Sequence, residues 1–145
     1  MSVALALILI PFAVLAGEKV SGTTFYVFDQ QNYPTGEETG YWVGNAEGIQ
    51  HPAEGPLGTS PIECHGAGFW AKEGSWGEGI CLIGEKDDTR VMRWWRDKGE
   101  QVSYWEHVSG TGKYASMTGK GTYKGQRLTA NRWITEWEGE VTPGQ

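Results

Sequence analysis

The sequence predicts an all-β domain, and more narrowly an antiparallel up-and-down β-barrel of eight strands. Glycine supplies 22 of the 145 residues, roughly double its usual share of ~7%. No window of eleven or more residues repeats its apolar side chains at helical spacing. Instead, short segments of mixed apolar and polar residues recur with turn residues between them. These three observations favour strands joined by turns.

The expected strands follow one another along the chain, most of them as hairpins. The segment His51–Ser60 carries two prolines and two glycines, so it is expected to be a loop. Turns are expected at "AKEG" (Ala71–Gly74), at "RDKGE", where Gly99 would take a positive φ, and at "KGQ" around Gly125. The expected strands are Thr23–Gln30, Gly40–Ile49, Ile62–Trp70, Ser75–Ile83, Thr89–Arg96, Gln101–Val108, Met117–Tyr123 and Leu128–Trp137.

Eight sequential antiparallel strands are enough to close a small barrel, and closure removes the unpaired edges of an open sheet. A two-sheet β-sandwich is the alternative, because periodicity alone does not distinguish closure from stacking.

The N-terminal residues 1–16, "MSVALALILIPFAVLA", are expected to be a secretory signal peptide. The apolar run is too short for the ~20 residues of a membrane-spanning helix, and Val14 and Ala16 suit the small-residue cleavage rule. No Lys or Arg precedes the run, so a buried N-terminal element or an uncleaved anchor are the alternatives. Residues 17–145 would then form one secreted or periplasmic domain with no stable membrane span.

The two cysteines fit an exported protein, in which an even number of cysteines is usually paired. If Ala71–Gly74 is a hairpin loop, Trp70 faces Ser75 and Cys64 comes directly opposite Cys81. The sequence therefore predicts a Cys64–Cys81 disulfide, with two buried thiols or half of a metal site as the alternative. No CxxC or His spacing supports a metal site.

The net charge of −6 and the pI near 5.0 exclude non-specific nucleic-acid binding, because no basic stripe offsets them. Nucleotide binding is also not expected at the glycine-rich stretch Ser109–Tyr123. His107 and Tyr114 stand where a P-loop needs Gly and Ser or Thr. A dinucleotide fingerprint needs a following helix, which the three glycines of "SMTGKGTYKGQ" do not favour. The glycines are therefore predicted to shape a tight corner and a coiled strand.

The stretch "GTGKYASMTGKGTY", which follows an aromatic strand, resembles the allene oxide cyclase and dirigent-like family of β-barrels, and similar small exported bacterial proteins. The resemblance covers about Ile62 to Trp137 and includes the glycine-rich hairpin of Cys64 and Cys81. It departs at Ser109, where relatives often carry glycine. The resemblance implies an eight-stranded barrel whose lumen holds apolar small molecules, with cyclase activity in some members. No catalytic residue is carried over.

A candidate ligand-binding face comes from the hairpin of residues 89–108 and from the last strand. With Arg96 opposite Gln101, Arg93 and Glu106 become diagonal neighbours on one face of the sheet. Charges among apolar neighbours are costly to bury unless they are paired, so this face is interpreted as a lumen with a polar anchor. The predicted ligand-binding residues are Arg93, Trp95, Tyr104, Glu106 and Arg132.

Two other interpretations of this hairpin stay open. The pair Arg93 and Glu106 could be an ordinary ion pair on the outer surface. Alternatively, Met92, Trp94 and Trp105 could fill the interior, which would leave Arg90 and His107 near a rim.

His65 lies close to Glu63 and Glu78 in the expected hairpin, so an acid–base or metal pair can be drawn. A hydrogen-bonded structural histidine is the simpler interpretation, and neither a metal nor a cofactor is expected. The sequence thus predicts an exported barrel that binds a small, largely apolar molecule without transforming it. The alternatives are a cyclase or isomerase of an apolar substrate, and a structural or adhesive surface module.

Overall fold

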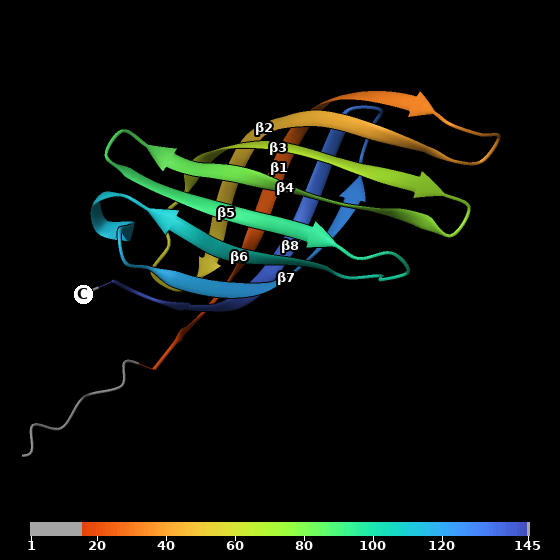
Figure 1. Cartoon of the computed structure of the whole chain (residues 1–145). Helices are drawn as coiled ribbons and strands as arrows, with labels where there is room; N and C mark the ends of the chain where they lie inside the picture. The colour runs from red at the N-terminus through yellow and green to blue at the C-terminus, as the bar shows by residue number, and fades with distance from the viewer. Residues whose placement is uncertain (1–15, 145) are drawn as a thin grey trace, which may run out of the picture.

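The protein is a closed barrel of eight antiparallel strands in sequential order (Figure 1), which confirms the predicted barrel over the sandwich. The computed structural model describes residues 16–144, so the predicted signal peptide lies outside it apart from Ala16. Among these residues no helix is long and apolar enough to cross a membrane. The strands are β1 (Glu18–Pro34), β2 (Gly40–Glu54), β3 (Ser60–Ala71), β4 (Gly74–Glu85), β5 (Asp88–Arg96), β6 (Ser103–Gly110), β7 (Thr118–Arg127) and β8 (Arg132–Thr142), and a single 3-10 turn, η1 (Gly112–Tyr114), precedes β7.

The barrel closes where β8 pairs with β1, the last strand with the first. Their ladder runs from Glu18 opposite Val141 to Val27 opposite Arg132, and Figure 1 shows the two strands side by side. Every strand therefore has a neighbour on both sides over part of its length, as expected for a closed barrel.

The first two strands are longer than the sequence pattern predicted. β2 continues to Glu54, so the expectation of a loop from His51 is wrong for its first four residues. Pro52 lies opposite Gly22, next to a register shift between Ser21 and Gly22. Proline is tolerated in a strand at such an irregularity because the ladder of backbone hydrogen bonds is already interrupted there, so the missing N–H of proline removes no bond.

The turn predicted around Gly125 is also wrong. Gly125 lies within β7 opposite Thr135, and the chain turns instead between β7 and β8. The side chain of Arg127 explains this turn, since its Nε donates to the carbonyl oxygen of Thr129 at 3.0 Å and its Nη2 to that of Ala130 at 2.7 Å. These bonds satisfy turn carbonyls that have no ladder partner.

The predicted register of β3 and β4 is confirmed. Trp70 pairs with Ser75 and Cys64 with Cys81, and the two cysteines form the predicted disulfide. A bond that closes a loop of this length, 17 residues apart in sequence, stabilises by about 3 kcal/mol in the chain-entropy model.

The register of β5 and β6 differs from the prediction by two residues. Arg93 pairs directly with Glu106, and Trp95 pairs with Tyr104. The difference arises because β6 begins at Ser103 rather than Gln101, which leaves a longer turn in which Gly99 has the expected positive φ, +86°. A shift of two residues leaves each side chain on its own face of the sheet.

The glycine-rich corner after β6 brings Tyr114 into the end of the barrel. Gly112 has a positive φ of +53°, which suits the tight corner that the sequence predicted. Gly110 has no positive φ, but a side chain there would overlap the backbone of Tyr114. Because β7 rather than a long helix follows η1, the corner lacks the helix of a dinucleotide site.

Candidate functional site

The interior of the barrel holds a cavity of about 660 Å³. Seven of the eight tryptophans line it, all except Trp95, together with other aromatic side chains such as Tyr26 and Phe28. Six of the seven lie on the inner face, whereas Trp76 pairs with the outward-facing Phe69 and borders the cavity from the outer face. This volume lies within the range of pockets that enclose small organic molecules, which are also mostly apolar.

The tryptophans fit inside a narrow barrel because glycines lie beneath them. A side chain at Gly66 or Gly79 would overlap the indole of Trp94 or approach it within 2.6 Å, and one at Gly121 or Gly139 would come within 2.7 Å of Trp105. The indoles therefore lie close against the barrel wall over bare backbone. This arrangement accounts for the joint abundance of glycine and tryptophan in the sequence, and it gives the cavity flat aromatic walls.

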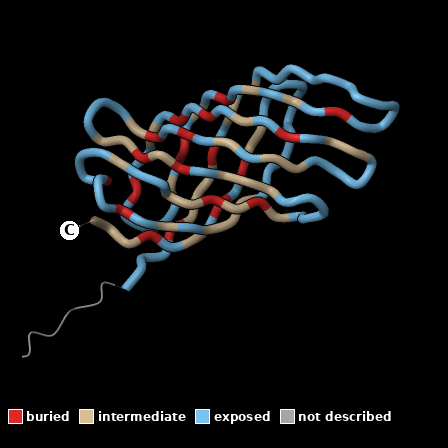
Figure 2. Tube along the Cα trace, in the orientation of Figure 1, coloured by how far each residue is buried: buried red, intermediate tan, exposed pale blue. Residues whose placement is uncertain are grey.

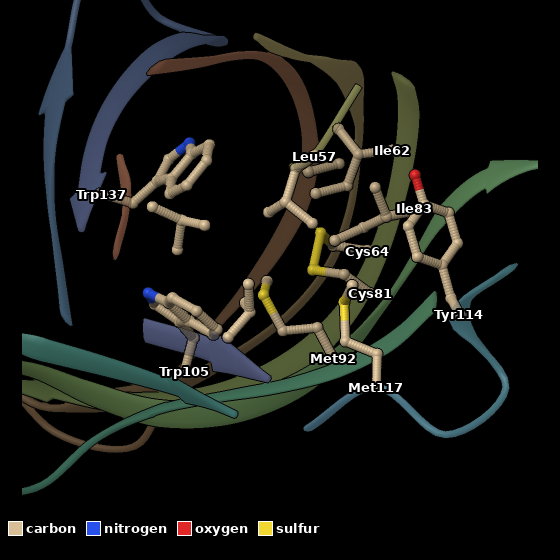
Figure 3. Close-up of a cluster of buried hydrophobic side chains, with 13 residues drawn as sticks. Leu57, Ile62, Cys64, Cys81, Ile83, Met92, Trp105, Tyr114, Met117 and Trp137 are labelled. Atoms are coloured by element: carbon tan, nitrogen blue, oxygen red, sulfur yellow. A yellow bond between two sulfur atoms is a disulfide. The ribbon is translucent and has the colours of Figure 1, made fainter. Parts of the chain in front are cut away.

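One end of the barrel is closed by packed side chains. The cavity lining reaches Gln50, Leu57 and Arg90 at this end, and a plug of buried residues lies beyond it. Figure 2 shows buried segments along the barrel body and exposed hairpin tips. In Figure 3, Leu57, Ile62 and Ile83 gather near the disulfide, with Trp105 and Trp137 on the other side. The plug residues are Val20, Ile62, Ile83, Tyr114, Met117 and Val141.

The opposite end of the cavity lies among the β1–β2, β3–β4 and β7–β8 hairpins. Asn32, Trp70 and Arg127 line it there, and Asn32 and Arg127 are exposed. A ligand would therefore enter from the hairpin side and meet the plug at the other end.

Arg90 of β5 lies at the closed end and is only 1% exposed. Its Nη2 donates to the Oε1 of Gln50 in β2 at 2.7 Å, so the side chain reaches across the barrel. The guanidinium also lies 5.0 Å from the centre of the Tyr114 ring, within cation–π range. Its Nε and Nη1 have no hydrogen-bond partner. Burial lowers the pKa of Arg90, but guanidinium remains charged at neutral pH.

His107 of β6 lines the same cavity, and its buried Nδ1 has no hydrogen-bond partner. The ring is 5.4 Å from the ring of Trp105, measured between centroids. Burial, and to a lesser extent the positive charge of Arg90, together lower the pKa of His107 to about 4. The imidazole is therefore neutral at pH 7, with one nitrogen able to donate and the other to accept.

The other polar groups in the cavity lining include phenols and hydroxyls. Burial raises the pKa of both Tyr26 and Tyr123, so both phenols stay protonated. The Nε of Arg96 donates to the hydroxyl of Ser103 at 2.9 Å. The indole of Trp137 donates to the hydroxyl of Thr24 at 3.1 Å. These groups can orient an uncharged part of a ligand.

The face that was predicted to be the lumen lies outside the barrel. On β5, Met92 and Trp94 line the cavity, whereas Arg93 and Trp95 do not. The interpretation in which Met92, Trp94 and Trp105 fill the interior describes the structure, although Arg90 is buried at the closed end and not at a rim. A ligand-binding role for the outer residues stays a prediction.

Four of the five predicted residues meet on the outer face of β5 and β6. Arg93 contacts Glu106 at 3.6 Å and also Glu78 of β4 at 2.7 Å. The guanidinium lies 5.1 Å from the Trp95 ring, which stacks on Tyr104 at 5.6 Å. Arg93 and Trp95 also line a second pocket.

Arg132, the fifth predicted residue, is not part of this group. It is the first residue of β8, and it pairs with Val27 of β1. Its side chain is exposed, and its backbone carbonyl closes the β7–β8 turn by accepting from Leu128 at 2.8 Å.

His65 belongs to a surface network. Its Nε2 lies 3.1 Å from the carboxylate of Glu63, and its Nδ1 lies 2.7 Å from the side-chain oxygen of Asn45. Glu78 contacts Arg93 instead. Within residues 16–144, no group of three or more His, Cys, Asp or Glu side chains is placed to hold a metal ion.

No family model and no curated protein sequence matches the chain. Among solved structures, the chain is similar to the pterocarpan synthase dirigent protein, with a TM-score of 0.54 and 12% identity over 98% of this chain and 100% of that one. At this identity the likeness shows the fold alone, which is a dirigent-like barrel. The likeness to allene oxide cyclases and to exported bacterial proteins stays a prediction.

Proposed function

We propose that this protein is an exported barrel that binds a small, largely apolar molecule in its lumen. The single observation that carries the proposal is the cavity of about 660 Å³, which is closed at one end and walled by tryptophans. A core built only for stability would fill this space, since protein interiors pack as densely as organic crystals. An interior left open and lined by aromatic faces gains its apolar contacts when a ligand enters.

Two further observations support the proposal. The similar dirigent barrel is described as a pterocarpan synthase, which supports a small molecule as the kind of ligand. The Cys64–Cys81 disulfide supports an oxidising compartment, because structural disulfides rarely persist in a reducing cytosol. Secretion or residence in a periplasm is therefore part of the proposal.

Native mass spectrometry of protein purified from its own host tests the proposal directly. We expect the folded protein to carry a non-covalent small molecule. Filling the lumen should displace it, so Ala46→Phe, at a buried position in the cavity lining, is expected to abolish the added mass. Val43→Phe, an outward change on the same strand, is the matched control and should retain it.

Two results would change this conclusion. If Ala46→Phe folds by circular dichroism and still carries the same molecule, the ligand lies outside the lumen. If the retained molecule is converted to a product by the purified protein, the barrel is an enzyme, such as a cyclase or isomerase, rather than a carrier.

A further inference from the structure

We propose that the ligand carries an anionic oxygen group, such as a carboxylate, which Arg90 and His107 bind at the closed end of the barrel while the flat apolar remainder lies against the indoles. This inference rests on the proposed function and narrows its ligand class.

The first argument is the isolated charge of Arg90. A buried guanidinium normally has a carboxylate partner, because an unpaired charge in a low-dielectric interior is costly. The hydrogen bond of Arg90 goes to the neutral amide of Gln50, and its other contact is the face of Tyr114. Neither partner supplies a negative charge, and two of its nitrogens stay without an acceptor.

The second argument is the composition of the cavity wall. Over the part of the chain that the structure describes, neither Asp nor Glu lines the cavity. The other two arginines in the wall, Arg96 and Arg127, lie toward the hairpin end and are better exposed to solvent. The acidic side chains of the described residues therefore lie outside the cavity wall, and the guanidinium of Arg90 makes the closed end locally positive. An anion from outside the chain would complete this site.

The third argument is the position of His107 beside Arg90. Its unpartnered Nδ1 is a second buried polar atom in the cavity lining, and after burial the charge of Arg90 is the second cause of the lowered pKa of His107. In the tautomer that carries hydrogen on Nδ1, the neutral ring donates a hydrogen bond. One anion can then accept from both side chains, and bonds to charged donors are about twice as strong as neutral ones.

The shape of the cavity defines the rest of the ligand. The indoles of Trp42 and Trp94 are nearly parallel, with an interplanar angle of 4° and centroids 6.2 Å apart. Both lie over glycines of β3, so they present flat apolar surfaces along the wall. A flat aromatic or conjugated skeleton fits these surfaces, and stacking on them adds to the energy of burial.

The matched probes 2-naphthoate and 2-naphthamide test the inference, since they share a flat skeleton and differ in charge. Binding is measured by the change in tryptophan emission at pH 7. The wild-type protein should bind 2-naphthoate at least ten-fold more tightly than 2-naphthamide. Arg90→Met should remove this preference by weakening the naphthoate complex, and the affinity for naphthamide should change little.

Arg93→Met separates the inner site from the outer face of the same strand. The Arg93→Met variant should keep the preference for naphthoate. If this variant loses the preference, the inference is overturned in favour of the outer residues. If Arg90→Met does not fold, His107→Phe replaces it and should weaken naphthoate binding at least three-fold. Unchanged naphthoate affinity in a folded Arg90 or His107 variant would also overturn the inference.

The two proposals fail in different ways. Equal binding of the two probes to the wild-type protein would overturn the anionic ligand class and leave the lumen as a binding site. If neither probe binds and the native protein carries no ligand, the proposed function is wrong, and this inference is wrong with it.

Discussion

Arg90 and Arg93 lie three residues apart on β5, yet their side chains have opposite surroundings. Arg90 faces inward, is 1% exposed, and has no carboxylate partner among the described residues. Arg93 faces outward, is 44% exposed, and contacts the carboxylates of both Glu78 and Glu106. Because successive side chains of a strand point to opposite faces, an odd separation places the two arginines on different sides of the wall.

The comparison shows that the ion pair of Arg93 lies on the outer face of the barrel and not in the cavity wall. The paired arginine lies in water, where the pair contributes little, whereas the unpaired one lies inside. A protein that supplies its own carboxylate to an interior cation has no charge left to offer a ligand. The missing partner of Arg90 is therefore more informative about function than the complete network of Arg93.

The largest expected difference between the two faces concerns their aromatic side chains. Trp105→Ala should lower the free energy of unfolding by about 4 kcal/mol, because Trp105 is buried against Gly121 and Gly139 and its removal leaves a void. Phe69→Ala, on the outer face, is the matched control. Phe69 is 54% exposed and stacks on Trp76, so its loss should cost less than about 1.5 kcal/mol. Urea unfolding of both variants measures the difference, and equal losses would contradict the assignment of the faces.

A smaller effect is expected from the titration of His107. Its pKa is about 4 in the folded protein and about 6.5 in the unfolded chain, so the unfolded state binds the proton more readily between these values. The contribution of the neutral His107 ring to the free energy of unfolding is therefore complete above about pH 6.5 and is lost as the pH drops toward 4. Between pH 7.5 and pH 5 the free energy of unfolding should fall by about 2 kcal/mol.

His107→Phe tests this pH dependence, because it removes the titrating group and keeps a ring in the same place. The wild type and the variant are compared by urea unfolding at several pH values. If the free energy of unfolding changes with pH by the same amount in the variant as in the wild type, other groups cause the pH dependence.

The smallest expected effect is that of Arg93→Met on stability. Arg93 and both of its carboxylate partners are well exposed, so we expect no resolvable change in the midpoint of thermal unfolding. Scanning calorimetry of this variant beside the wild type is the measurement. A large loss of stability would mean that the outer network is a structural bridge of the β4–β5–β6 wall.

The sequence pattern predicted the hairpins well where local chemistry determines them. The register of β3 and β4, which has no irregularity, followed from the short turn after Trp70. It correctly placed Cys64 opposite Cys81. The strand ends were less predictable. β2 runs through Pro52 because β1 pairs with it there, and the β7–β8 turn depends on hydrogen bonds from Arg127 that no turn motif indicates.

The face of the sheet that forms the lumen could not be read from hydrophobicity, because both faces carry apolar residues. Leu82 and Val108 are about half exposed on the outside, and they resemble core residues in the sequence. One sequence signal was missed. Gly66 and Gly79 share the face of the disulfide in β3 and β4, and the lack of a side chain at these glycines leaves room for Trp94 inside the barrel. Gln50, the partner of Arg90, carried no signal because it stood at the edge of the expected loop.

The sequence by itself determined the class of fold, the sequential order of the strands and the covalent link, because these depend on turn chemistry and on contacts between neighbours in the chain. Only the tertiary structure decided which face encloses the cavity and which polar groups meet inside it. Arg90 and Gln50 are 40 residues apart and come together because the sheet closes on itself. Alternation divides a strand into two faces, but the direction in which the sheet curves decides which of them becomes the interior.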